Sequence, residues 1–327
     1  MRQSFVCPAC GYKVTADREV KFCELCGGKM SADQEVNTGP LKFEYRKSAI
    51  NFDKVYADLQ VTFHTMDYIL VTIEGEPEML SEIVVDATNP TIEVHGKLPG
   101  VEKLTKYSGI EIEDGVVTVD GIVLDPKKKL RINLTLPMIA EVQLGKFAIG
   151  LFVGQQDGGT LTILNSGFMN VIVWSLEDLT YDLSGMADAI VLDVKGKFKC
   201  SMSGNGGFSG RNIGGPANIE ISGNANLGFV SMKGNVDLEI SGSCSFETQS
   251  LNAKLCQVDL SGNGNVQILN GSVDQLSAEI SGAGSMGFAM EVNRGTYEIS
   301  GAGSIHTKKC KSVLSSEVTG AGSITFG

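Results

Sequence analysis

The stretch Glu279-Ile-Ser-Gly-Ala-Gly-Ser-Met286 decides the fold, because close copies follow at Glu298-Ile-Ser-Gly-Ala-Gly-Ser-Ile305 and Glu317-Val-Thr-Gly-Ala-Gly-Ser-Ile324. Weaker copies precede it, and the Ser or Thr of each copy is a convenient marker: Ser184, Ser203, Ser222, Ser241, Ser261, Ser281, Ser300 and Thr319. The markers are 19 or 20 residues apart. A period this regular indicates stacked copies of one supersecondary unit.

Each copy has an apolar residue directly before the marker, a small residue three positions after it and, in most copies, a large apolar residue five positions after it. Short apolar runs broken by Gly, Asn and Ser, without helical spacing, predict short strands joined by tight turns. Repeated about every 20 residues, such strands favour a parallel β-helix, whose coils stack at about 4.8 Å. A leucine-rich repeat has a similar period, but its Leu and Asn pattern is absent. The Gly after each marker is expected at a corner that needs either a positive φ or a close backbone approach.

The composition agrees with an all-β repeat protein. The 327 residues include 40 Gly, 8 Pro and 7% aromatic residues, which is unlike an α/β enzyme, and 42% hydrophobic residues argue against disorder. A net charge of −11 repels phosphate, so nucleic acid is an unlikely partner. The sequence shows neither a membrane span nor a signal peptide, and we therefore expect a cytoplasmic protein.

Three segments are expected along the chain. Residues 1–30 carry four cysteines, residues 31–39 read as a polar linker, and residues 40–327 show only strand signals. Within the last segment we expect irregular coils over 40–160 and regular coils over 161–327. The irregular part contains longer alternating runs that predict strands: Val55–Phe63, Tyr68–Ile73, Thr91–Val94, Val116–Val119 and Leu130–Leu136.

Two Cys-x-x-Cys motifs near the N-terminus predict a zinc ribbon. Cys7, Cys10, Cys23 and Cys26 have the spacing of a closed, tetrahedral, structural site for one Zn²⁺, with no position left open for catalysis. The alternative is a pair of disulfides or unlinked thiols. The remaining cysteines share no repeat position and are expected as buried thiols rather than disulfides: Cys200, Cys244, Cys256 and Cys310.

An acidic residue stands two positions before the marker in seven of the eight copies: Asp182, Glu220, Glu239, Asp259, Glu279, Glu298 and Glu317. In a β-helix these side chains stack into one row. Like charges on adjacent strands repel, so the row is either a solvated face or a stripe that binds cations, a basic partner or a glycan.

No catalytic constellation is found in the sequence. Gly282-Ala-Gly-Ser-Met-Gly287 matches a dinucleotide-binding fingerprint, but no helix follows it and its first part recurs as repeat corners. The three histidines are scattered along the chain. We therefore expect no enzymatic activity.

The last copy of the repeat has no capping segment after it. A bare final coil presents unpaired backbone groups, and we expect Val318, Ile324 and Phe326 to form an end through which the chain associates into a homo-oligomer.

The chain resembles the head GIN-domain group of bacterial β-helix proteins, known as putative auto-transporter adhesins. The resemblance rests on Ile50-Asn-Phe-Asp-Lys-Val-Tyr56, on Leu130-Arg-Ile-Asn-Leu-Thr-Leu-Pro137 and on the Ser-Gly coils, and it covers about Ala49 to Gly327. It implies a right-handed β-helix without catalytic residues. Residues 1–30 are similar to bacterial zinc-ribbon modules.

Three functions follow from these patterns. The leading one is a non-enzymatic scaffold, in which the zinc ribbon recruits a protein partner and the β-helix forms a self-associating rod. The alternative is a surface or secreted adhesin that binds glycan or protein along a β-helix face. A third is a polysaccharide-active enzyme that uses the acidic row, which alanine at Glu279 and Glu298 would test.

Overall fold

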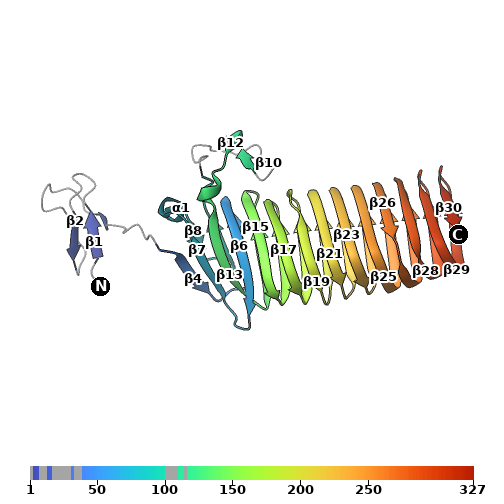
Figure 1. Ribbon diagram of the computed structural model, residues 1–327, viewed down its shortest axis with the longest axis horizontal. Helices are drawn as coiled ribbons and strands as arrows, with labels where there is room; N and C mark the ends of the chain where they lie inside the picture. The colour runs from blue at the N-terminus through green and yellow to red at the C-terminus, as the bar shows by residue number, and fades with distance from the viewer. Residues whose placement is uncertain (1–2, 7–12, 17–30, 33–38, 100–109, 114–115) are drawn as a thin grey trace.

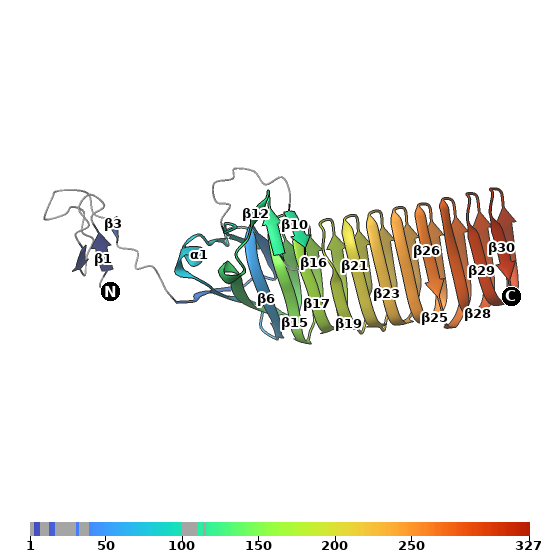
Figure 2. The same cartoon turned by 45° about the horizontal axis from the view of Figure 1, so that its top comes forward.

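The computed structural model describes residues 3–6, 13–16, 31–32, 39–99, 110–113 and 116–327. Twenty-four of the described strands between Leu41 and Phe326 form one sheet that winds into a long parallel β-solenoid (Figure 1). The coils stack one behind the next along the rod (Figure 2). The predicted all-β repeat fold is therefore confirmed for the described residues.

One regular coil shows how the sequence produces this fold. In β22 (Ala217–Ile221) the first, third and fifth side chains are buried, while Asn218 and Glu220 point outward. The corner Ser222-Gly223 follows, and β23 (Asn224–Lys233) continues the coil. The alternation has a period of two because successive side chains of a strand point to opposite faces.

Each strand pairs in parallel with the equivalent strands of the coils before and after it. β22 lies between β20 (Phe198–Met202) and β24 (Val236–Ile240), and β23 lies between β21 (Asn205–Ile213) and β25 (Ser243–Leu260). The other strands of the regular coils are β14 (Ile139–Leu144), β15 (Ala148–Asp157), β16 (Thr160–Asn165), β17 (Phe168–Leu176), β18 (Asp178–Leu183), β19 (Ala189–Val194), β26 (Asn263–Ile268), β27 (Gly271–Ile280), β28 (Ala283–Ile299), β29 (Ser304–Val318) and β30 (Ser323–Phe326).

The Gly after each marker is required by a close backbone approach, which decides between the two reasons given above. A Cβ on Gly223 would lie 2.0 Å from the carbonyl oxygen of Gly204 in the preceding coil. Gly223 is not among the residues with positive φ. The corner glycines thus stack on one another at a distance that excludes any side chain.

The core is a continuous apolar column along the rod. Aromatic rings contact one another within a coil and between successive coils, with centroid distances of 5.0 Å between Phe198 and Phe208, 5.7 Å between Phe208 and Phe229, and 5.6 Å between Phe229 and Phe246. All four side chains are buried. Tilted ring pairs at such distances add to the stability that area burial provides.

The N-terminal end of the solenoid is irregular. β5 (Ala49–Asp53) lies between β14 and β9 (Thr91–His95), and β6 (Val55–His64) lies between β15 and β13 (Leu130–Pro137). Antiparallel strands complete this end, namely β7 (Ile69–Glu74) against β13, β4 (Leu41–Tyr45) against β7, and β8 (Val84–Asp86) against β9. The strands predicted in this region coincide with β6, β7, β9, β11 (Val116–Val119) and β13.

The prediction of strands alone after residue 40 was wrong at two places. A helix, α1 (Pro77–Ser81), places Met79 and Leu80 in the core at the end of the solenoid, and a 3-10 turn, η1 (Pro126–Lys128), precedes β13. Both are too short to show helical periodicity in the sequence. Each has a proline in its first turn, but a loop can carry the same proline, so this residue alone does not predict a helix.

Two small antiparallel sheets accompany the solenoid sheet. One contains β10 (Ile110–Glu113), β11 and β12 (Ile122–Val123), and Val117 and Val119 belong to a small core cluster with Tyr56 and Ile149 of the solenoid. The other contains β1 (Gln3–Val6), β2 (Lys13–Ala16) and β3 (Ser31–Ala32). Cys7, Cys10, Cys23 and Cys26 lie outside the described residues, so the zinc ribbon stays a prediction.

Candidate binding surface

The seven acidic residues of the repeat form one row on the outside of the solenoid, here called the acid row. Pairing runs in register from Asp182 through Ser201 to Glu220, and then without interruption through the remaining acids, Glu239, Asp259, Glu279, Glu298 and Glu317. Because equivalent residues of stacked coils are about 4.8 Å apart, six carboxylates follow one another at that spacing.

Few side chains neutralise the acid row. Lys199 Nζ lies 3.7 Å from Glu220 Oε1, and Gln257 Nε2 donates to Asp259 Oδ2 at 2.9 Å. The other five carboxylates have no side-chain hydrogen bond or ion pair within the part of the chain that the structure describes. The acid row is therefore a stripe of negative charge whose carboxylates are free to accept hydrogen bonds.

A polar groove runs beside the acid row. Its volume is about 690 Å³, and its walls include four carboxylates of the acid row, from Asp182 to Asp259, and four marker serines, from Ser203 to Ser261. The serine backbones are fixed, since the N–H of Ser222 donates to Met202 O at 3.0 Å in the preceding coil. The serine hydroxyls are held more loosely, as the 3.4 Å contact of Ser241 Oγ with Ile221 O shows. The groove thus offers both carboxylate acceptors and hydroxyl groups.

The polar surface continues around the corner of the coil. A further groove of about 450 Å³ is lined by marker serines and by the residues two positions later, which are Asn205, Asn224, Ser243 and Asn263. This second row can be read from the sequence, because the repeat places Asn or Ser two residues after several markers. It was not recognised above, where only the acidic position was considered.

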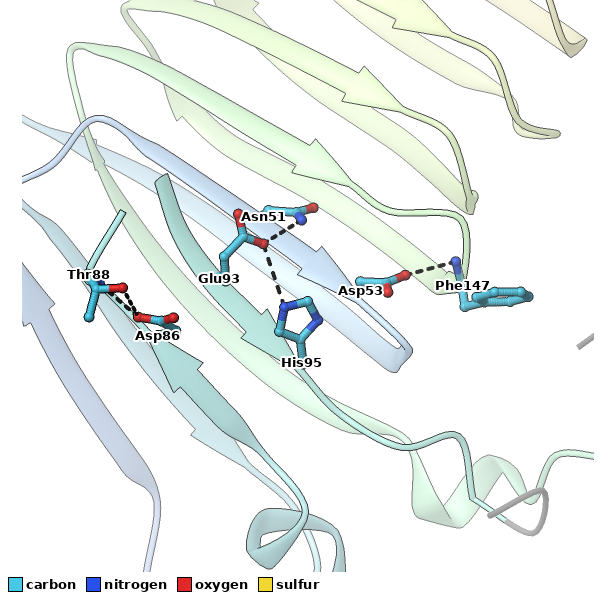
Figure 3. Close-up of polar contacts among 7 residues, drawn as sticks. All are labelled: Asn51, Asp53, Asp86, Thr88, Glu93, His95 and Phe147. Atoms are coloured by element: carbon cyan, nitrogen blue, oxygen red, sulfur yellow. Dashed lines mark hydrogen bonds and ion pairs between the residues drawn. The ribbon is translucent and has the colours of Figure 1, made fainter. Parts of the chain in front are cut away.

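At the N-terminal end of the rod, the position that is in register with the acid row carries different residues. Polar contacts join these side chains to their neighbours (Figure 3). Asn51 Nδ2 donates to Glu93 Oε2 at 2.7 Å, and His95 Nε2 lies 3.7 Å from the same oxygen. Nearby, the backbone N–H and the hydroxyl of Thr88 both donate to Asp86, which lowers the pKa of that carboxyl group. The first coils therefore lack free carboxylates at this position, and the acid row begins at Asp182.

The structure also places the other residues singled out from the sequence. Cys200, Cys244 and Cys256 are buried free thiols and Cys310 is a half-buried one, as predicted. Burial raises the pKa of Cys244 and of Cys256 to about 12. No group of three or more His, Cys, Asp or Glu side chains in the described ranges could hold a metal ion.

The C-terminal coil exposes apolar side chains. Val318 is 42% exposed and Phe326 is 44% exposed, while Ile324 packs partly against the core. The ring of Phe326 contacts Tyr297 edge to face, with a centroid distance of 5.1 Å. These residues lie together on the last coil, and nothing in the described chain tests their association with a second copy.

A parallel β-solenoid with a long polar face defines the class of this protein. The chain belongs to the family described as "Putative auto-transporter adhesin, head GIN domain", whose model matches residues 51–286 and 212–327. The resemblance noted from the sequence is thereby confirmed for the solenoid. No curated protein matches the chain.

Several solved structures are similar over most of their length. A putative adhesin from Parabacteroides distasonis is 14% identical, with 89% of this chain and 98% of that chain covered and a TM-score of 0.45. A putative adhesin from Parabacteroides merdae is 16% identical, with 89% and 97% covered and a TM-score of 0.38. A protein called a putative lipid binding protein, also from P. distasonis, is 17% identical, with 89% and 98% covered and a TM-score of 0.35. Among the described helices, none has the length and apolar character needed to cross a membrane.

Proposed function

We propose that the protein is a non-enzymatic binding protein of the adhesin type, which holds a hydroxyl-rich glycan along the acid row and the serines beside it. One observation carries this proposal: a groove of about 690 Å³ is lined by serine hydroxyls and by four carboxylates of the row, of which Asp182 and Glu239 have no side-chain partner among the described residues. The membership in an adhesin family supports a binding role.

The chemistry of the groove favours sugars. A carboxylate accepts hydrogen bonds from sugar hydroxyls, and hydrogen bonds to an ionised acceptor are stronger than neutral ones. The stacked coils repeat the same groups about every 4.8 Å, so a chain molecule can make many weak contacts at once. The negative charge of the row repels acidic polysaccharides and favours neutral or amino-substituted ones.

The test measures binding of immobilised protein to three polysaccharides: a neutral glucan, chitosan and polygalacturonate. We expect chitosan or the glucan to bind, and the double variant Glu239→Gln, Asp259→Asn to weaken this binding at least tenfold. Glu247→Gln is the matched control, because Glu247 is an exposed acid outside the groove. Equal binding by the double variant and the control, or preferred binding of polygalacturonate, would contradict the proposal.

The adhesin family also supports a surface or secreted location in place of the cytoplasmic one expected from the sequence. Treatment of intact cells with a protease tests this proposal. Loss of the solenoid from intact cells, with a cytoplasmic marker protein retained, is the expected result. Full protection until the cells are lysed would favour the cytoplasmic scaffold.

Two parts of the scaffold hypothesis remain proposals. One Zn²⁺ bound by Cys7, Cys10, Cys23 and Cys26 would let residues 1–30 fold and recruit a protein partner. Self-association would use Val318, Ile324 and Phe326. Light scattering over a concentration series tests the second part, with Ile324→Asp as the variant that is expected to lower the molar mass to that of a monomer.

A further inference from the structure

An apolar groove lies at the opposite ends of the strands from the marker serines. It crosses the first residues of β18, β20, β22 and β24, and its volume of about 550 Å³ falls within the range of small-molecule sites. Buried side chains such as Leu179, Phe198 and Val236 form its floor, and the exposed Pro216 and Leu255 form apolar walls.

Four charged side chains line this groove, and two of them already have polar partners. Asp178 accepts hydrogen bonds from the backbone N–H of Lys197 at 2.6 Å and from Thr160 Oγ1 at 3.3 Å. Lys199 Nζ lies 3.7 Å from Oε1 of Glu220 in the acid row. The ammonium group of Lys197, in contrast, has no ion pair within the described residues. Lys197 therefore presents an ammonium group without an ion pair at the border of the apolar surface.

The opposite charge is available two coils further along. Asn218 Nδ2 donates to Asp237 Oδ2 at 3.4 Å, but Asp237 Oδ1 and Asn218 Oδ1 are shielded from water and have no hydrogen-bond partner in the described chain. Turning the Asn218 amide over would place its oxygen against the carboxylate, so the assigned orientation is the favourable one. These two oxygens are closed to solvent, but the Asp237 carboxylate has no ion pair among the described residues, and a ligand that supplies an ammonium group would complement its charge.

The register fixes the distance between the two charges. Lys199, Asn218 and Asp237 are successive partners in one outward row, and Lys197 lies two residues before Lys199. Two coil steps of about 4.8 Å and an offset of two residues of about 3.3 Å each place the backbones of Lys197 and Asp237 roughly 12 Å apart, which three extended residues of peptide, about 10 Å long, can span with the reach of the lysine side chain.

We propose that this groove binds a short, extended, apolar peptide. Its free carboxylate lies at Lys197, its free ammonium group lies at Asp237 and Asn218, and its side chains cover Pro216 and Leu255. A fatty acid fits the apolar surface and Lys197, but it provides no positive charge for Asp237. This site is independent of the glycan proposal, because it uses the opposite edge of the same strands.

The test is a calorimetric titration of the full chain with trileucine, and with trileucine blocked either by an N-terminal acetyl group or by a C-terminal amide. We expect Lys197→Gln and Asp237→Asn each to weaken trileucine binding by up to about fivefold, which is what a partly exposed charge pair is worth. The acetylated peptide is expected to be insensitive to Asp237→Asn, and the amidated peptide to Lys197→Gln. Lys233→Gln and Asp274→Asn are controls outside the groove and should leave all affinities unchanged.

Three results would overturn the proposal. These are no binding of trileucine at millimolar concentration, equal binding of the free peptide and the two blocked peptides, and binding of decanoate that depends on Lys197 but not on Asp237. The variants replace partly or fully exposed polar side chains, and an unchanged melting temperature shows that each is folded. Glycan binding measured on the same variants distinguishes failure of this proposal from failure of the proposed function.

Discussion

Replacing Glu279 by Gln should stabilise the protein. The side chain stands between Asp259 and Glu298 in the acid row. Two carboxylates at a coil spacing of about 4.8 Å repel each other by about 0.9 kcal/mol in water. At about 0.15 M salt, screening halves this energy, so removing one charge between two neighbours relieves about 1 kcal/mol.

The measurement is the free energy of unfolding of Glu279→Gln, determined in urea at low, physiological and molar salt. Glu247→Gln is a close control, because it is the same substitution at an exposed strand position whose register partners, Gly228 and Gln267, are uncharged. We expect stabilisation of Glu279→Gln alone, and we expect it to disappear at about 1 M salt, where the screening length is about 3 Å. If both variants behave alike, or if the gain is independent of salt, the repulsion argument is wrong.

Three further predictions concern the glycines, the thiols and the zinc. Gly223→Ala should destabilise the coil by at least about 3 kcal/mol in thermal unfolding, because its Cβ meets a backbone oxygen at 2.0 Å. Gly228→Ala is the control and should change stability by no more than about 0.5 kcal/mol, because its Cβ has nothing within 4 Å. Similar losses in the two variants would contradict the close approach. Iodoacetamide at neutral pH should modify Cys310 before Cys256, whose pKa is raised to about 12 by burial, and peptide mapping by mass spectrometry would reveal the opposite order. Metal analysis should find one zinc ion per chain and none after Cys7, Cys10, Cys23 and Cys26 are all replaced by Ser, and an unchanged content would reject the ribbon.

The regular coils could be predicted closely because each repeat contains the residues that determine its strands and its corner. The Ser-Gly corner, the apolar residues on either side and the acid two positions earlier all keep their spacing, so the register of the acid row follows from the sequence alone. The corner glycine left two explanations open, and only the distance of Gly223 from Gly204 decided between them.

The irregular end and the apolar groove could not be predicted in the same way. Which strands flank β5 and β6 depends on contacts between residues as distant as Thr62 and Thr135, which no local pattern encodes. The groove depends on Lys197, Pro216 and Leu255, three different residues at equivalent corners of successive coils. A search for repeated residues does not detect these three residues, because they differ from coil to coil.

The placement of β5 and β6 between later strands has a consequence for synthesis of the chain. Their partners on one side, β9 and β13, and on the other side, β14 and β15, all follow them in the sequence. During translation the strands of the earliest coil therefore cannot complete their pairing on both sides until about residue 157 has left the ribosome. From that point each new coil needs only the one before it, so growth becomes local and proceeds one repeat at a time. The slow step of folding should then belong to the first half of the chain, and the second half should add to it as fast as it emerges.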